Sequence, residues 1–181
     1  MSLKSYIFDR TLRKQPERSA RFPHLDQPLK IILLYESDVL ERNDSIKTIR
    51  QELLRRQMDV TMWGFVEKKE IQTLILPQSR ILGLNDYNIF GKPREDVLKD
   101  LQAEHYDLLI DLTTRPLLPL RYIAMFTIAD FKAGLHLGEG IHDMLISLPD
   151  FTPEQGDEAE IEASWLFNQI MEYLTTIKSN D

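Results

Sequence analysis

The sequence contains no cysteine among its 181 residues, which excludes disulfides, thiolate metal ligands and cysteine nucleophiles. No apolar stretch approaches the length of a transmembrane helix. Residues 1–15 lack the continuous apolar region and small-residue cleavage site of a secretory signal. Since a chain without cysteine also fits a reducing compartment, we predict a cytoplasmic protein.

Several chemical signatures are missing as well. There is no G-x-S-x-G nucleophile elbow, no G-x-G-x-x-G after the first predicted strand, and the Gly91-Lys92-Pro93 tripeptide lacks the rest of a phosphate loop. The net charge of -7 argues against a nucleic-acid-binding protein, because neutralising phosphates needs clustered lysine and arginine. We therefore predict no cofactor and no nucleic-acid partner.

Histidine is scarce, with four residues and no paired spacing typical of metal ligands. His136, Glu139, His142 and Asp143 would converge only if the strands flanking the Gly138–Gly140 turn paired as a hairpin. Surface histidines are the more common outcome of such a pattern. No metal site is predicted.

What the sequence does contain is a series of short apolar runs without alternation, typical of strands covered on both faces of a parallel sheet. The predicted strands span residues 29–35, 59–66, 108–112, 131–137 and 143–148, and residues 71–76 suit either a strand or a helical turn. Helical spacing follows at residues 43–57, 94–105, 120–129 and 158–177. The pattern predicts a single Rossmann-like three-layer α/β domain with a mostly parallel sheet of about five or six strands.

Residues 1–28 precede this domain, which we place at residues 29–181. Residues 3–14 fit a short amphipathic helix, and prolines then punctuate a linker. The segment is basic; its cations are Lys4, Arg10, Arg13, Lys14, Arg18 and Arg21. Such a helix packs on its own domain, docks on a partner, or lies on an anionic membrane through residues 1–15.

Polar side chains follow two of the predicted strands where each strand ends. Glu36 and Asp38 follow the first strand, and Asp111 ends the central one. Thr113, Thr114 and Arg115 come directly afterwards. Because ligands of open α/β sheets bind outside the carboxyl ends of the strands, these residues are the candidate ligand-binding set.

Two interpretations of this set remain open. Crowded carboxylates at one edge could serve acid–base chemistry or hold a divalent cation. Alternatively, Asp111 caps its own turn and pairs with Arg115, which is the more common role. Residues 81–93 form a glycine- and asparagine-rich loop that either closes a pocket or packs aromatic side chains in the core; its candidate lid residues are Asn85, Phe90, Gly91 and Lys92.

The central strand, Tyr106-Asp107-Leu108-Leu109-Ile110-Asp111-Leu112, resembles that of the N-terminal domain of heptosyltransferase-type GT-B glycosyltransferases, and residues 131–135 resemble a later strand of that domain. The resemblance implies a Rossmann-like fold, but the family's glycine-containing first turn is absent and the chain has no room for the sugar-nucleotide domain. As a whole the chain is similar to an uncharacterised family of short bacterial proteins. Gly64-Phe65-Val66, residues 89–93 and residues 108–112 carry that similarity, which implies no activity.

The leading functional prediction is a non-catalytic binding or interaction module, with an unidentified protein or small molecule as its partner. The alternative is a small-molecule transferase or hydrolase, a glycosyltransferase-like half domain acting at the strand ends. A deep pocket under the 85–93 loop would favour the enzyme, and a flat apolar patch beside the N-terminal helix would favour the module.

Overall fold

The protein is a three-layer α/β structure built on one six-stranded sheet. The computed structural model describes residues 2–37, 40–67, 77–137, 140–147 and 162–177, with the backbone alone at 40–43. The strands are β1 (Lys30–Glu36), β2 (Asp59–Phe65), β3 (Ser79–Leu82), β4 (His105–Asp111), β5 (Ile128–Leu135) and β6 (Met144–Ile146). Every pairing is parallel and the order is β3-β2-β1-β4-β5-β6. This order confirms the predicted Rossmann-like fold.

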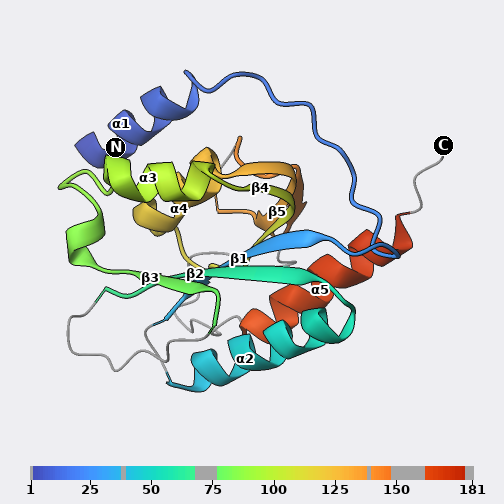
Figure 1. Ribbon diagram of the computed structural model, residues 1–181. Coiled ribbons are helices and arrows are strands. Elements are labelled where there is room, and N and C mark those ends of the chain that lie inside the picture. The colour runs from blue at the N-terminus through green and yellow to red at the C-terminus, as the bar shows by residue number, and fades with distance from the viewer. Residues whose placement is uncertain (1, 38–39, 68–76, 138–139, 148–161, 178–181) are drawn as a thin grey trace.

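Helices cover both faces of the sheet, as Figure 1 shows. The helices α2 (Leu40–Arg55) and α5 (Ala163–Thr176) pack on one face through a core that includes Leu33, Ile49 and Phe167. The helices α3 (Glu95–Gln102) and α4 (Leu118–Phe126) cover the other face. Successive residues of β1 point to opposite faces of the sheet, and helices cover both faces. The side chains on both faces are therefore apolar, which is why the sequence of β1 does not alternate between polar and apolar residues.

The structure corrects several predicted boundaries. β3 was not predicted as a strand, because Ser79 and Arg80 interrupt its apolar pattern. β5 begins at Ile128, inside the predicted helix 120–129, and α4 ends at Phe126. Asp130 hides the start of β5 in the sequence, since an acidic residue does not suit a buried strand. Residues 71–76 and the predicted start of the last helix at 158 lie outside the described residues.

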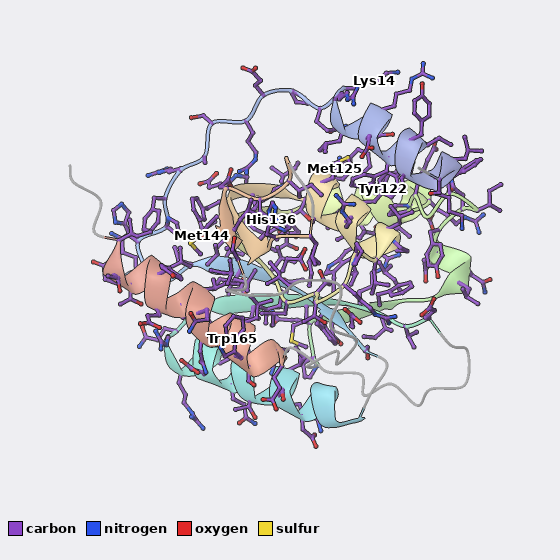
Figure 2. The ribbon with its side chains drawn as sticks, turned by 180° about the vertical axis from the view of Figure 1, so that it is seen from behind. Lys14, Tyr122, Met125, His136, Met144 and Trp165 are labelled. Carbon is purple, nitrogen blue, oxygen red and sulfur yellow. The ribbon has the colours of Figure 1, made fainter. Side chains whose placement is uncertain are left out.

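The N-terminal segment packs on its own domain. The helix α1 (Leu3–Leu12) lies against α4, where the buried ring of Phe8 meets Tyr122 edge-on with 4.9 Å between ring centroids. Figure 2 shows Tyr122 and Met125 of α4 beside α1, with Trp165 of α5 on the opposite side of the sheet. Phe8 was not part of the apolar face predicted from the sequence; of that face, Leu12 packs against the same cluster, whereas Leu3 and Tyr6 are exposed.

Residues 13–28, which we call the strap, lead from α1 to the start of β1 along the outside of the molecule (Figure 1). Arg18 donates to the carbonyl oxygens of Ala129 and Asp130, and the amide of Arg21 donates to Asp130. Phe22 then packs edge-on against Phe131, with centroids 5.3 Å apart. The strap therefore ties α1 to the start of β5.

β5 and β6 are parallel neighbours, so the residues between them cannot form the hairpin considered for the histidines. Within the described part of this connection, Ile141 is buried on the α4 side of the sheet, in the same cluster as that helix. This return brings residues 140–143 next to β5.

Candidate functional site

The predicted strand-end residues do meet at one edge, because β1 and β4 are neighbours and Leu34 pairs with Asp111. β2 lies on the other side of β1, so this is the point where the order of the sheet reverses. Glu36 and Asp111 are both buried, each with 2% of its surface exposed. Buried acids need hydrogen-bond partners, and their partners decide what the edge can do.

Glu36 is bonded to the segment that follows β4. One carboxylate oxygen accepts from the amide of Thr114 at 3.2 Å, and the other accepts from Nε of Arg115 at 2.7 Å. Arg115 also lies 3.7 Å from the exposed carboxylate of Glu67. Glu36 thus fastens the chain after β4 to the end of β1.

Asp111 is bonded on both oxygens. One accepts from the amide and the hydroxyl of Thr113, at 3.0 and 2.7 Å, so Asp111 caps its own turn. The other lies 3.0 Å from Nε2 of His142, whose side chain is only 8% exposed. An ionised carboxylate only accepts, so toward an ionised Asp111 the Nε2–H group of His142 is the donor.

Gly134 makes this contact to His142 possible. It pairs with Asp111 across β4 and β5, and a Cβ atom there would lie 2.9 Å from Nε2 of His142 and 3.1 Å from Cβ of Asp111. A side chain at residue 134 would occupy the space of the imidazole. The sheet is therefore shaped to admit His142.

The structure brings five of the six predicted strand-end residues together; the sixth, Asp38, lies outside the described residues. Glu36, Asp111 and Thr113 are buried, whereas Thr114 and Arg115 reach the surface. From the sequence, His142 was a possible metal ligand only, and its bond to Asp111 was not predicted. Nothing in the local sequence links residues 111 and 142, since the contact depends on the path between β5 and β6.

The predicted lid loop is a compact turn beside the start of α4. The Asn88 side chain accepts from the amides of Phe90 and Lys92, Gly91 has a positive φ of 77°, and the Lys92 ammonium lies 5.7 Å from the ring centroid of Phe126. Asn85 lies in a short 3-10 helix, and its carbonyl accepts from Arg94 at 3.3 Å.

A groove of about 520 Å³ runs between this loop, the end of β2 and residues 116–119. Ile89 stands at its side with 77% of its surface exposed, so the loop leaves the groove open. Tyr87 packs on Phe65, with centroids 5.6 Å apart.

A second cavity, of about 670 Å³, lies beneath the strap, and we call it the strap cavity. Its walls are residues 15–19 of the strap, residues 125–130, Gln102, His105, Lys132 and residues 140–143, with Leu12 of α1. The lining mixes apolar side chains such as Met125 with arginine, lysine, histidine and aspartate side chains. His142 lines it too, so the strap cavity reaches the partner of Asp111.

Lys132 is the most unusual residue of the strap cavity, because it is a lysine with only 3% of its surface exposed. Its Nζ donates to the carbonyl oxygens of Ala124 and Met125, at 2.6 and 3.2 Å, in the last turn of α4. Burial, and secondly the charge of Arg18, lower the pKa of Lys132 to about 7, although Asp143 opposes the shift.

Asp143 joins three parts of the cavity wall. One of its oxygens accepts from Arg18 of the strap and, at 2.8 Å, from the amide of Lys132. His105 and Asp130 form a further pair, with 2.9 Å between Nε2 and a carboxylate oxygen. The cavity was not predicted from the sequence, because the strap, α4 and residues 140–143 are far apart in the chain. The one hint of the cavity in the sequence was Lys132, a lysine in the middle of a predicted strand.

No group of three or more histidine, aspartate or glutamate side chains in the described part of the chain could hold a metal ion. Among the described helices, none is long and apolar enough to cross a membrane.

These features define a Rossmann-like α/β protein with a closed strand-end edge and a polar cavity beneath its N-terminal strap. The chain belongs to a family of unknown function (DUF6913), whose model matches residues 2–156. No curated protein matches it. Among solved structures, E. coli heptosyltransferase WaaC with ADP is similar at 14% identity and a TM-score of 0.45, over 76% of this chain and 46% of that one. The chain thus spans less than half the length of that enzyme.

Proposed function

We propose that this protein is a non-catalytic binding module that takes a small polar molecule in the strap cavity. The observation that carries the proposal is the convergence of Arg18, Lys132 and His142 on one cavity from three separate segments. At about 670 Å³ its volume is within the usual range of ligand sites. We also propose that the protein acts in the bacterial cytoplasm, which a chain without cysteine supports.

The contacts at the strand ends support a binding role over catalysis there. A transferase or hydrolase acting at that edge would need a carboxylate facing its ligand. Both buried acids are instead bonded to the protein: Glu36 to Thr114 and Arg115, and Asp111 to Thr113 and His142. The enzyme alternative would require the edge to open and release these bonds.

The experiment is a thermal-shift screen against nucleotides, nucleotide sugars, phosphosugars and small sugars, followed by calorimetry on any ligand found. The variant Gln102→Trp adds a bulky ring at the wall of the strap cavity, where Gln102 is exposed. Lys99→Trp is the matched control, because Lys99 is exposed on the same helix but does not line the cavity.

The proposal predicts a ligand whose affinity falls at least about tenfold, or 1.4 kcal/mol, in Gln102→Trp and is unchanged in Lys99→Trp. A ligand that binds both variants as it binds the native protein, but loses affinity when Asp111 is replaced by alanine, would move the site to the strand ends and favour the enzyme.

A peripheral membrane contact through residues 1–15 is the second candidate. Leu3 and Tyr6 are 66% and 54% exposed on α1, next to Lys4, although Phe8 faces α4. An apolar pair flanked by cations suits an anionic lipid surface. The native protein should float with vesicles of phosphatidylserine and phosphatidylcholine, and the double variant Leu3→Ser/Tyr6→Ser should not. The control variant Tyr173→Ser, which removes an exposed ring from α5, should still float. Native protein that does not float would end this candidate.

A further inference from the structure

We propose that the ε-amine of Lys132 captures a small polar aldehyde or ketone in the strap cavity as an imine. This inference rests on the proposed function and names the class of ligand. It follows from three features of the cavity: the hydrogen bonds of the amine, its surroundings, and the histidine that shares its side of β5.

The hydrogen bonds of Lys132 suit a neutral amine. A neutral amine has two N–H donors and one lone pair, whereas an ammonium has three donors. Within the described residues Nζ has two acceptors, the carbonyl oxygens of Ala124 and Met125. The neutral form therefore donates both hydrogens to α4 and keeps its lone pair for a reaction. Lys132 and Met125, one of the two residues whose carbonyl oxygens accept from its amine, both line the strap cavity.

The charges around the amine favour that neutral form near pH 7. Burial is the main cause of the lowered pKa, and Arg18 adds to it, while Asp143 favours the cation. The carbonyl oxygens at the end of α4 favour the cation as well, through the helix dipole. With its pKa at about 7, a large share of Lys132 is unprotonated at neutral pH, unlike an ordinary lysine.

His142 lies on the same side of β5 as Lys132. Lys132 and Gly134 are two residues apart, so their side-chain directions share one face of the strand, roughly 6.6 Å apart along it. The imidazole of His142 occupies the space above Gly134 and is oriented by Asp111. An imidazole in this position can exchange protons with a ligand held between it and the amine.

The reaction balances without an oxidant or reductant. The amine lone pair attacks the carbonyl carbon, and one proton moves from the nitrogen to the carbonyl oxygen to give a neutral carbinolamine. The nitrogen then loses a proton as the hydroxyl leaves as water, which forms the C=N bond. Water reverses both steps, so the capture is a reversible covalent binding event and needs no turnover.

The test uses the native full-length protein, glyceraldehyde as the probe and cyanoborohydride to reduce any imine to a stable secondary amine. Labelled lysines are mapped by peptide mass spectrometry after short reaction times at pH 7. Lys30, Lys47 and Lys92 serve as internal controls, since Lys30 has a raised pKa beside Glu104 and Lys47 pairs with Asp44 near the surface. Because all lysines compete in one folded molecule, the readout does not depend on a variant that folds.

We expect Lys132 to be labelled about tenfold faster than each control at pH 7, because far more of it is neutral. The advantage over ordinary lysines should shrink at pH 10, where an ordinary lysine begins to lose its proton, and Gln102→Trp should slow Lys132 alone. Labelling of Lys132 no faster than that of Lys47 would overturn the inference. If a ligand found by calorimetry is still blocked by Gln102→Trp in that case, the strap cavity remains the binding site and only the imine is lost.

Discussion

Nε2 of His142 lies 3.0 Å from a carboxylate oxygen of Asp111, although 31 residues separate them. The contact ties the strand-end edge of β4 to the wall of the strap cavity. Its cause is backbone geometry: Gly134 of β5 pairs with Asp111 and leaves the space that the imidazole fills.

Gly134→Ala should therefore destabilise the protein, since the new Cβ would lie 2.9 Å from Nε2 of His142. We expect a loss of about 1–3 kcal/mol in the free energy of unfolding, measured by urea denaturation. Gly83→Ala is the control, because a Cβ there would meet nothing closer than 3.9 Å. Equal effects of the two substitutions would show that His142 does not occupy this space.

Replacing Glu36 tests whether its hydrogen bonds hold the chain after β4 to the end of β1. Glu36→Ala removes the acceptor for the Thr114 amide and a partner of Arg115, and should cost about 2 kcal/mol of unfolding free energy. Glu67→Ala removes an exposed carboxylate 3.7 Å from the same arginine and should change stability by less than about 0.5 kcal/mol. A Glu36→Ala protein as stable as the native one would mean that Glu36 is available to a ligand.

The docking of α1 depends on Phe8, which is fully buried against Tyr122. Phe8→Ala should cost about 3 kcal/mol and should increase amide hydrogen exchange in α1. Tyr6→Ala, on the exposed side of the same helix, should change unfolding free energy by less than about 0.5 kcal/mol. Unchanged exchange in Phe8→Ala would mean that α1 is held by the strap alone.

The lowered pKa of Lys132 predicts that the free energy of unfolding changes with pH. Its pKa is about 7 in the folded protein and about 10.4 in an unfolded chain, so between these values the unfolded chain binds more protons. Stability contributed by this residue is therefore lowest below pH 7 and rises with pH. The unfolding free energy of the native protein should gain about 2 kcal/mol over that of Lys132→Met between pH 7 and pH 9.

Taking the difference between the two proteins removes the titration of groups that they share. Lys47→Met is the control, because Lys47 lies near the surface beside Asp44, and its difference from the native protein should stay flat over the same range. A flat difference for Lys132→Met would contradict the lowered pKa of Lys132.

The sequence was enough to predict the fold because the core strands are continuous apolar runs. The Leu29–Tyr35 and Asp59–Val66 runs correspond to β1 and β2, each to within a residue or two. The short strand β3 was not predicted, because Ser79 and Arg80 interrupt the run of apolar residues. The start of β5 was not predicted because Ile128 and Ala129 continue the apolar run of the predicted helix 120–129.

The candidate site was predicted in part, for a related reason. Strand ends are local features, so Glu36, Asp111 and Thr113 could be grouped from the order of elements alone. Their bonding could not, because it depends on His142 and on the exact path of the chain after β4. The strap cavity depends on Arg18 reaching the carbonyl of Ala129, a contact across 111 residues that no sequence pattern marks.

The measurement that tests the account most directly is a two-dimensional NMR titration of the native protein with a ligand from the thermal-shift screen. We predict that the amides with the largest shift changes are those around the strap cavity, at residues 15–19, 125–132 and 140–143. Changes concentrated instead at Glu36 and residues 113–115, with the strap amides unmoved, would contradict the account and place the ligand at the strand ends.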